Sequence, residues 1–319
     1  MKKILCVLMS CLLFVMAGCS GHSKNLKFGA ADIGGVYYSF ASTFTQLADK
    51  EIDGYTFETK TTAGSVANLR LISDGYIDLA IVQADLLSDA YNATGTFADK
   101  KYQKGYKAVA SLYTECCQIV VRKDSGITGI DDLINKTVSV GASESGTEKN
   151  AEQILKMSGI TDELINKVNM DYTEAAEKLK AGEIDAFFCT AGTRTEVIGQ
   201  LSKECDIRFI SLDDKCIDKM LSAYSLCEKY TIPAGTYNGQ DSDVTTIGVK
   251  AVLIAKQSLS DDVIKNVTKT IYEHADDFKY ATSLDISFDI NTAADGVDIP
   301  FHSGAAAYYT ERGINVLTE

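Results

Sequence analysis

Short runs rich in apolar, aromatic and β-branched residues alternate with longer amphipathic stretches in the first third of the chain. Three of these runs, at residues 26–31, 55–61 and 78–83, are predicted strands. The third, DLAIVQ, is almost wholly apolar, as strands buried in a parallel sheet are. Between the strands, apolar positions recur at helical spacing, first up to Ala48 and then at Leu69, Leu71 and Ile72. This order predicts an α/β unit.

A second unit of the same kind follows. Residues 137–155, TVSVGASESGTEKNAEQIL, predict a short strand, a turn of small polar residues and an amphipathic helix. A strand near 168–172, a helix in AAEKLKAGEI and a strand at 186–189 come next. The order of elements repeats that of the first unit, so we expect two lobes built alike.

Two long segments connect the predicted lobes. Residues 108–122 form a crossing, and the chain returns through a long strand after Tyr230, followed by helices at 260–278 and after Pro300. We therefore assign 26–112 and 236–319 to lobe 1 and 113–235 to lobe 2, with hinge crossings near 111–118 and 225–240. The expected fold class is α/β, with two mixed sheets flanked by helices and a central cleft.

The first residues predict an export signal rather than part of the fold. Lys2 and Lys3 precede an apolar run, and Val15-Met16-Ala17-Gly18-Cys19 resembles a bacterial lipobox. We predict a signal peptide at 1–18, a lipid on Cys19 and a tether at 19–25. The protein would then be extracytoplasmic and anchored to a membrane surface. A buried N-terminal helix and a true membrane anchor are the alternatives.

The charge balance disfavours one class of partner. The chain has 31 Lys and Arg against 44 Asp and Glu, a net charge of -13. Binding to nucleic acid is therefore not expected. An acidic protein can still bind an anion where local dipoles, rather than net charge, form the site.

Six cysteines would remain after processing: Cys116, Cys117, Cys189, Cys205, Cys216 and Cys227. Outside the cytoplasm an even count favours disulfides, and six cysteines allow 15 pairings. Cys205 and Cys216 flank a short strand and are the preferred pair. At least one of Cys116 and Cys117 is expected to be a buried thiol. With no close CxxC pairs and three histidines, we expect no metal site.

The strand, turn and helix at 137–155 predict an anion-binding site. Small residues let a ligand approach the main chain, and the first N–H groups of a helix carry the positive end of its dipole. Ser143, Ser145 and Thr147 add hydroxyl groups, although Ser145 or Thr147 could equally be a helix cap. A similar turn at 61–71, TTAGSVANLRL, suggests a clamp formed by two facing turns.

Several segments resemble one protein family. These are IGGVYYS, TTAGSVANLRLISDGYIDLAIVQADL, LYTE, SVGASESGTEKNAEQIL, IPAGTYNGQDSDVTTIGV and PFHSGAAAYYTERG. Together they are similar to solute-binding proteins of the TAXI branch of TRAP transporters. The resemblance implies a two-lobed periplasmic-binding-protein-like fold of type II that closes on a small carboxylate, such as glutamate, glutamine or a related organic acid. It also implies delivery to TRAP membrane permease subunits, with backbone amides and hydroxyls in place of an arginine.

The resemblance also implies a set of binding residues. They are Gly35, Tyr37, Ala63, Gly64, Ser65, Asn68, Gln83, Ser143, Ser145, Gly146, Thr147, Thr190, Ala191 and Gly192. The chain departs from the family pattern at Val36, Ser39, Ala63 and near Thr195, so the solute stays open. We expect a monomer with no cofactor and no catalytic residue.

Two other functions remain open at this point: a binding lipoprotein that serves a signalling receptor and, with less support, an enzyme on the same fold. The chain has no GxSxG elbow and no phosphate-loop lysine. Glu115, Glu144 and Glu148 are the carboxylates nearest the predicted site and are expected to be solvated or capping groups. His302 is expected to be structural.

Overall fold

The computed structural model describes residues 24–99, 102, 105–283 and 288–319. The predicted signal peptide, Cys19 and most of the predicted tether lie outside the described residues. The first strand begins two residues earlier than predicted, because Lys24 and Asn25, which were assigned to the tether, already belong to β1. No described helix is long and apolar enough to span a membrane.

The strands form one mixed sheet, in the order β2-β1-β3-β10-β4-β7-β5-β6, with β8 paired to β4 and β9 to β10. They are β1 (Lys24–Gly29), β2 (Tyr55–Lys60), β3 (Leu79–Gln83), β4 (Tyr106–Arg122), β5 (Thr137–Ser139), β6 (Asn166–Val168), β7 (Ala186–Ala191), β8 (Ile207–Phe209), β9 (Cys227–Ile232) and β10 (Val244–Lys256). Strands β1, β2 and β3 are parallel to one another, as are β5, β6 and β7.

The described helices are α2 (Val36–Glu51), α3 (Ser65–Ser73), α4 (Ala84–Asn92), α5 (Gly146–Met157), α6 (Tyr172–Ala181), α7 (Glu196–Glu204), α8 (Asp214–Ala223), α9 (Asp261–Glu273), α10 (Ala275–Thr282) and α11 (Ser303–Thr310). Short 3-10 turns lie at 95–97, 130–133, 162–164 and 290–292.

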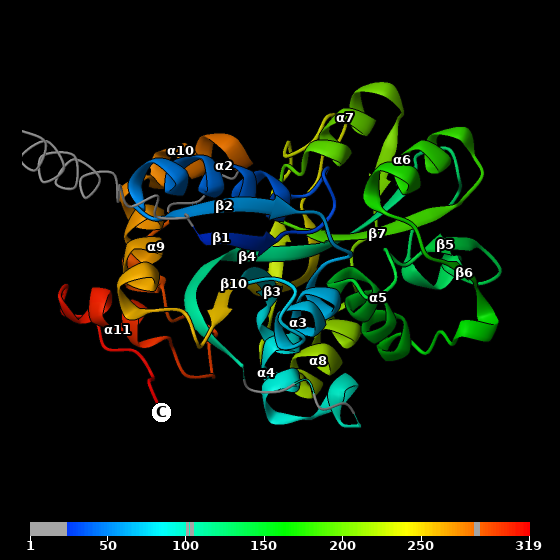
Figure 1. Ribbon diagram of the computed structural model, residues 1–319. Helices are drawn as coiled ribbons and strands as arrows, with labels where there is room; N and C mark the ends of the chain where they lie inside the picture. Colours follow the sequence, from blue (N-terminus) through cyan, green and yellow to red (C-terminus); the bar gives the residue numbers. More distant parts are fainter. Residues whose placement is uncertain (1–23, 100–101, 103–104, 284–287) are drawn as a thin grey trace, which may run out of the picture.

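The prediction of two separate sheets is wrong in one respect. Strands β4 and β10 pair with each other along nearly their whole lengths and cross the middle of the molecule. β3 pairs with one edge of β10, and β7 pairs with β4, so a single sheet continues through both parts of the chain (Figure 1). We call β1–β3 with α2–α4 the first half, and β5–β8 with α5–α8 the second half.

Some element boundaries also differ from prediction. The predicted strand at 168–172 ends at Val168, and Tyr172 begins α6 because Asp171 caps that helix by accepting from the Glu174 amide. The predicted helix at 260–278 is two helices, since the chain leaves helical geometry at His274.

The predicted Cys205–Cys216 disulfide is absent, and all six described cysteines are free thiols. Cys216 lies on the inward face of α8, where it accepts a hydrogen bond from Ser158, while Cys205 follows the end of α7. The two side chains therefore belong to different packing environments. Cys116 and Cys117 are both buried, as expected for at least one of them.

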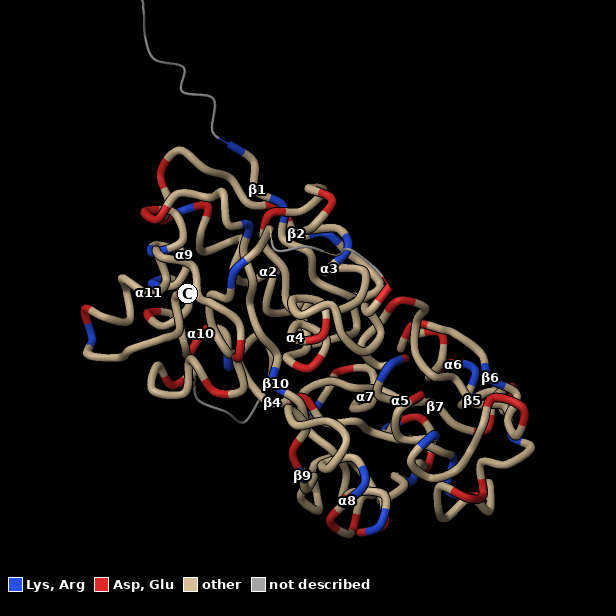
Figure 2. Tube along the Cα trace, turned by 90° about the horizontal axis from the view of Figure 1, so that it is seen from below, with Lys and Arg blue, Asp and Glu red and all other residues tan. Residues whose placement is uncertain are grey.

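Charged residues of both signs are interspersed along the chain in both halves (Figure 2). The core beneath them has two parts. The larger one extends from Phe28 and Phe44 in the first half to Phe187 in the second, and the smaller one joins Val138, Ile154 and their neighbours around α5 and α8. Packing on both sides of β4 and β10 fixes the positions of the strand ends, where the candidate site lies.

Candidate ligand-binding site

Five helices begin at one cavity between the two halves. The capping residues of α2, α3, α4, α5 and α6 are Gly35, Gly64, Gln83, Ser145 and Asp171, and every one of them lines this cavity. The centre of a water molecule can occupy about 40 Å³ of it, within an empty volume of about 460 Å³ that includes its opening to solvent. The positive ends of five helix dipoles therefore point toward one small space.

The sheet explains this convergence. Each of the five helices follows the carboxyl end of a parallel strand, from β1, β2 and β3 in the first half and from β5 and β6 in the second. Ligands of open α/β sheets bind at this end of the strands. Because β4 and β10 join the halves, the two sets of strand ends face each other.

The start of α5 offers the clearest pair of donors. The Ser145 hydroxyl accepts from the Glu148 amide at 2.9 Å, so the cap satisfies one amide of the first turn. The amides of Gly146 and Thr147 come too early in the helix for an intrahelical partner. Among the described residues no other acceptor binds them. Both residues line the cavity, where these donors are free for an anion.

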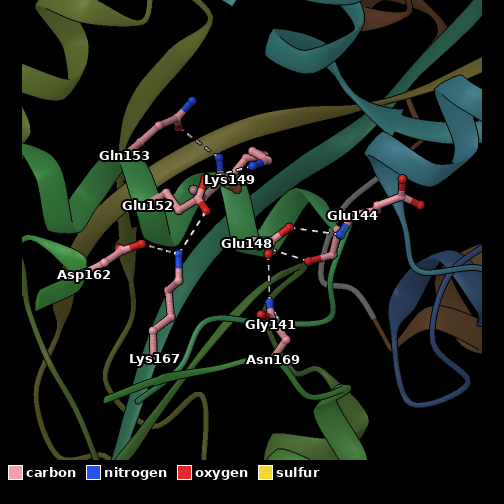
Figure 3. A network of polar contacts seen from close by, with 11 residues as sticks. Gly141, Glu144, Glu148, Lys149, Glu152, Gln153, Asp162, Lys167 and Asn169 are labelled. Atoms are coloured by element: carbon pink, nitrogen blue, oxygen red, sulfur yellow. Dashed lines mark hydrogen bonds and ion pairs between the residues drawn. The ribbon is translucent and has the colours of Figure 1, made fainter. Parts of the chain in front are cut away.

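The turn before α5 is held by side chains on its outer side (Figure 3). Glu148 accepts from the Glu144 amide at 2.9 Å and from Asn169 at 2.8 Å, and Asn169 also donates to the Gly141 carbonyl. Glu148, which was expected to be a solvated or capping group, thus holds the turn in position through hydrogen bonds.

A closed ring of hydrogen bonds joins Thr147 at the start of α5 to Tyr172 of α6 and Thr190 of β7. The Thr190 amide donates to the Thr147 hydroxyl at 3.1 Å, and the Tyr172 hydroxyl donates to the Thr190 carbonyl at 2.9 Å. The Thr147 and Tyr172 hydroxyls are 2.6 Å apart, so the Thr147 proton goes to Tyr172. The Thr147 hydroxyl is therefore used within the wall, which leaves the amide as the Thr147 donor that a ligand could use.

Glu115 was expected to be a solvated or capping group, and that expectation is wrong. Its side chain is 3% exposed and lines the cavity from the middle of β4. The Tyr37 hydroxyl donates to it at 2.8 Å. Burial raises the pKa of Glu115 to about 8, against the opposing effect of hydrogen bonds from Tyr37 and Gln83.

Asp32 is a second carboxyl group in the cavity wall. It accepts from the Tyr172 amide at 3.0 Å, which ties the turn before α2 to the start of α6. Burial and the neighbouring Asp171 raise its pKa. Among the described residues no cluster of histidine, cysteine, aspartate or glutamate is arranged to hold a metal ion.

Three further contacts join the halves around the cavity. The Ala67 amide donates to the Glu144 carbonyl at 3.0 Å, and Arg70 forms an ion pair with Glu144 at 2.7 Å. Gln83 donates to Asn150 at 3.0 Å beneath them. In Figure 3 the Glu144 carboxylate points away from the Glu148 network, on the side where Arg70 binds it. Glu144 therefore belongs to an inter-half contact.

The sequence profile of the NMT1-like family matches residues 28–313. The chain belongs to the NMT1-like family. The match covers both halves of the sheet, so the whole cavity lies inside the family region.

Solved structures share the fold of this NMT1-like protein. A protein from Bordetella bronchiseptica is 17% identical with a TM-score of 0.54, over 82% of this chain and 76% of its own. A putative L-cystine ABC transporter protein from Listeria monocytogenes is 13% identical with a TM-score of 0.52, over 82% and 94%. A ligand-binding component of an ABC-type import system from Staphylococcus aureus is 12% identical with a TM-score of 0.51, over 91% and 92%. At these identities the likeness shows the fold alone.

Most of the residues implied by the sequence resemblance lie at the cavity of the NMT1-like protein. Those that line it are Gly35, Tyr37, Ala63, Gly64, Ser65, Gln83, Ser145, Gly146, Thr147, Thr190 and Ala191. Asn68, Ser143 and Gly192 do not line it. Asn68 donates to the Ala30 and Ile81 carbonyls behind the wall, Ser143 is exposed, and the Gly192 carbonyl accepts from Thr195.

The cavity also contains residues that the binding-residue prediction did not include. They are Ala31, Asp32, Val36, Glu115, Ala142, Asp171 and Tyr172. Glu115 stands out in sequence as a charged residue between two apolar stretches of one strand, which is a usable signal of a buried function. His302 lies elsewhere, where it caps α11 by accepting from the Gly304 amide, a structural position as expected.

Proposed function

We propose that this protein is an extracytoplasmic solute-binding receptor of the TAXI type, which binds a small carboxylate and passes it to TRAP membrane permease subunits. The observation that carries the proposal is the convergence of five helix starts on one cavity, with the Gly146 and Thr147 amides free to donate. A carboxylate placed there would accept two main-chain hydrogen bonds and interact favourably with the helix dipoles.

The same geometry favours a receptor over an enzyme. Among the described residues no histidine or cysteine lines the cavity, and the hydroxyls of Ser145 and Thr147 are engaged within the wall. Among the described residues, neither of these two hydroxyls is hydrogen-bonded to a base that could activate it. A receptor for signalling would use the same site, and its partner would be a sensor instead of a permease.

Binding would work by closure of two lobes. In this proposal residues 26–112 and 236–319 move against 113–235, and the hinges lie at 111–118 in β4 and at 225–240 around β9. The ligand contacts helix starts from both lobes, so it stabilises the closed arrangement through interactions that only that arrangement allows. A lipid on Cys19 would keep the monomer at the membrane near its permease.

The test is native mass spectrometry of protein purified without refolding, followed by calorimetric titration with small carboxylates. We expect an unmodified small acid to co-purify and to rebind with a dissociation constant of about 1 μM or lower, roughly -8 kcal/mol. If no carboxylate binds, or if the bound compound is returned chemically altered, the receptor proposal is wrong.

The ion pair between Arg70 and Glu144 should contribute to closure. Arg70→Gln removes a pair that joins the lobes, and both side chains are partly exposed, so we expect a two- to fivefold loss of affinity, in line with about 0.2–1 kcal/mol for such pairs. Calorimetry with the co-purified acid measures it. Lys149→Gln is the control, because its pair with Glu152 lies within α5, and it should leave affinity unchanged. Equal losses in the two variants would contradict the role in closure.

A further inference from the structure

The charged side chains among the described residues of the cavity wall are all carboxyl groups. Asp32, Glu115 and Asp171 line it, while no lysine, arginine or histidine does within the described part of the chain. None of the ion pairs between described residues includes any of these three carboxyl groups. The cavity therefore combines helix starts that favour an anion with carboxyl groups that favour a cation.

Glu115 is the carboxyl group least accessible to water. It is nearly fully buried near the centre of β4, where it pairs with Val249 of β10 and directly precedes Cys116, the first residue paired with β7. Its neighbours in the wall are the neutral groups of Tyr37 and Gln83. An ionised carboxylate in such a place is unfavourable unless a cation comes to it.

Gln83 supplies a second, independent indication of a ligand donor. Its side chain is 2% exposed and lines the same cavity. Its amide nitrogen donates to Asn150, but its side-chain oxygen has no partner among the described residues. A buried acceptor without a donor destabilises the protein unless a ligand or water supplies one. The oxygen faces Gly146, next to the free amides of α5.

We infer that the ligand is a zwitterionic α-amino acid, whose carboxylate lies at the start of α5 and whose ammonium group is bound by Glu115 and Gln83. This inference rests on the proposed function and narrows the class of solute. An ammonium group has three donors and a full positive charge, so it satisfies both acceptors at once. The Gln83 side chain lies against Gly146, and Glu115 lines the same cavity, so one small molecule in the cavity could meet both the amides and the acceptors.

The same wall disfavours a second anionic group. A dicarboxylate would bring its additional negative charge toward Asp32, Glu115 or Asp171 with no cation among the lining residues to receive it. Neutral amino acids such as glutamine should therefore bind more tightly than glutamate. Acids without an amino group should bind weakly, because the acceptors of Glu115 and Gln83 would stay unpaired.

The experiment compares matched pairs of probes on the full-length protein. Calorimetric titrations use neutral L-amino acids and their counterparts without the amino group, for example L-glutamine and glutaramate, with L-glutamate and glutarate alongside. We expect at least one amino acid to bind, and its counterpart to bind at least 100-fold more weakly. Glu115→Gln should weaken the amino acid at least 100-fold and leave the counterpart unchanged or tighter. Glu163→Gln, at an exposed position, is the control.

Proton release gives a second readout that a merely structural role would not produce. An ammonium group beside Glu115 lowers its pKa from about 8, so binding releases a proton near pH 7 and affinity rises about tenfold per pH unit between pH 6 and 8. The titratable groups that face Glu115 are Tyr37, Asp85, Tyr113, Cys116, Tyr172 and Cys189. Burial raises the pKa of each tyrosine and cysteine in this set, so they stay neutral in that range.

The outcomes separate the two proposals. If acids with and without the amino group bind equally well, or if Glu115→Gln keeps its affinity for the amino acid, this inference is overturned while the receptor proposal stands. If no carboxylate of either kind binds the wild-type protein, the receptor proposal itself fails and the inference fails with it.

Discussion

Replacing Gly64 with alanine should lower both stability and ligand affinity. Gly64 has φ +120° and ψ -149°, a conformation that side-chain-bearing residues rarely adopt. It caps α3 at the cavity, and a Cβ atom there would lie 3.5 Å from the Ser145 Cα of the other half. Space is therefore adequate, and the backbone is what resists the change. We expect the free energy of unfolding to fall by about 1–3 kcal/mol.

Affinity should fall tenfold or more, because Gly64→Ala can relieve its strain by turning the first residues of α3 away from the cavity. Gly54→Ala is the matched control: it also has positive φ (79°), with nothing near its Cβ position, and it lies in the turn before β2. Thermal unfolding and calorimetry on both variants separate the effects. Both should lose stability, but only Gly64→Ala should lose affinity, and wild-type affinity in Gly64→Ala would refute the assigned position of the ligand.

The stability of the ligand-free protein should fall as the pH rises from about 4 to 8. Burial raises the pKa of Glu115 to about 8 and that of Asp85 to about 6, whereas both groups titrate near pH 4 in the unfolded chain. In this range the folded state binds more protons than the unfolded state. Unfolding is therefore favoured as protons are removed, by up to about 1.4 kcal/mol per pH unit for each group.

Two variants separate the contributions of Glu115 and Asp85 to this loss of stability. Glu115→Gln should remove the decline between pH 6 and 8, and Asp85→Asn should remove part of the decline between pH 4 and 6. Chemical denaturation at pH 5, 6, 7 and 8 measures both. A Glu115→Gln variant that loses stability between pH 6 and 8 as steeply as the wild type would show that Glu115 is not the buried acid responsible.

The parts of the fold that depend on local sequence could be predicted well. The turns at Gly35, Gly64 and Ser145 carry small residues directly before amphipathic helices, and these are the positions where α2, α3 and α5 begin. The strands before these helices are short runs that contain apolar, aromatic or β-branched residues, which made them recognisable. Because parallel strands share one edge, these local predictions were enough to bring most of the implied binding residues to a common cavity.

The parts of the fold that could not be predicted depend on the register of strand pairing and on the face of the sheet toward which a side chain points. The sequence of one strand reveals neither. β4 is apolar along most of its 17 residues, so the pattern could not show that Glu115 points into the cavity. Tyr172 was placed in a strand, although Asp171 caps a helix there and turns the tyrosine hydroxyl toward Thr147. Pairing of β4 with β10 over both halves joined what were expected to be two sheets.

A crystal structure of the protein with its co-purified solute would show whether the carboxylate of the solute is held at the start of α5, as we propose. We predict carboxylate oxygens within about 3.0 Å of the Gly146 and Thr147 amides, at the usual length of such hydrogen bonds. A solute bound outside this cavity, or one whose carboxylate contacts neither amide, would rule out the proposed position of the carboxylate.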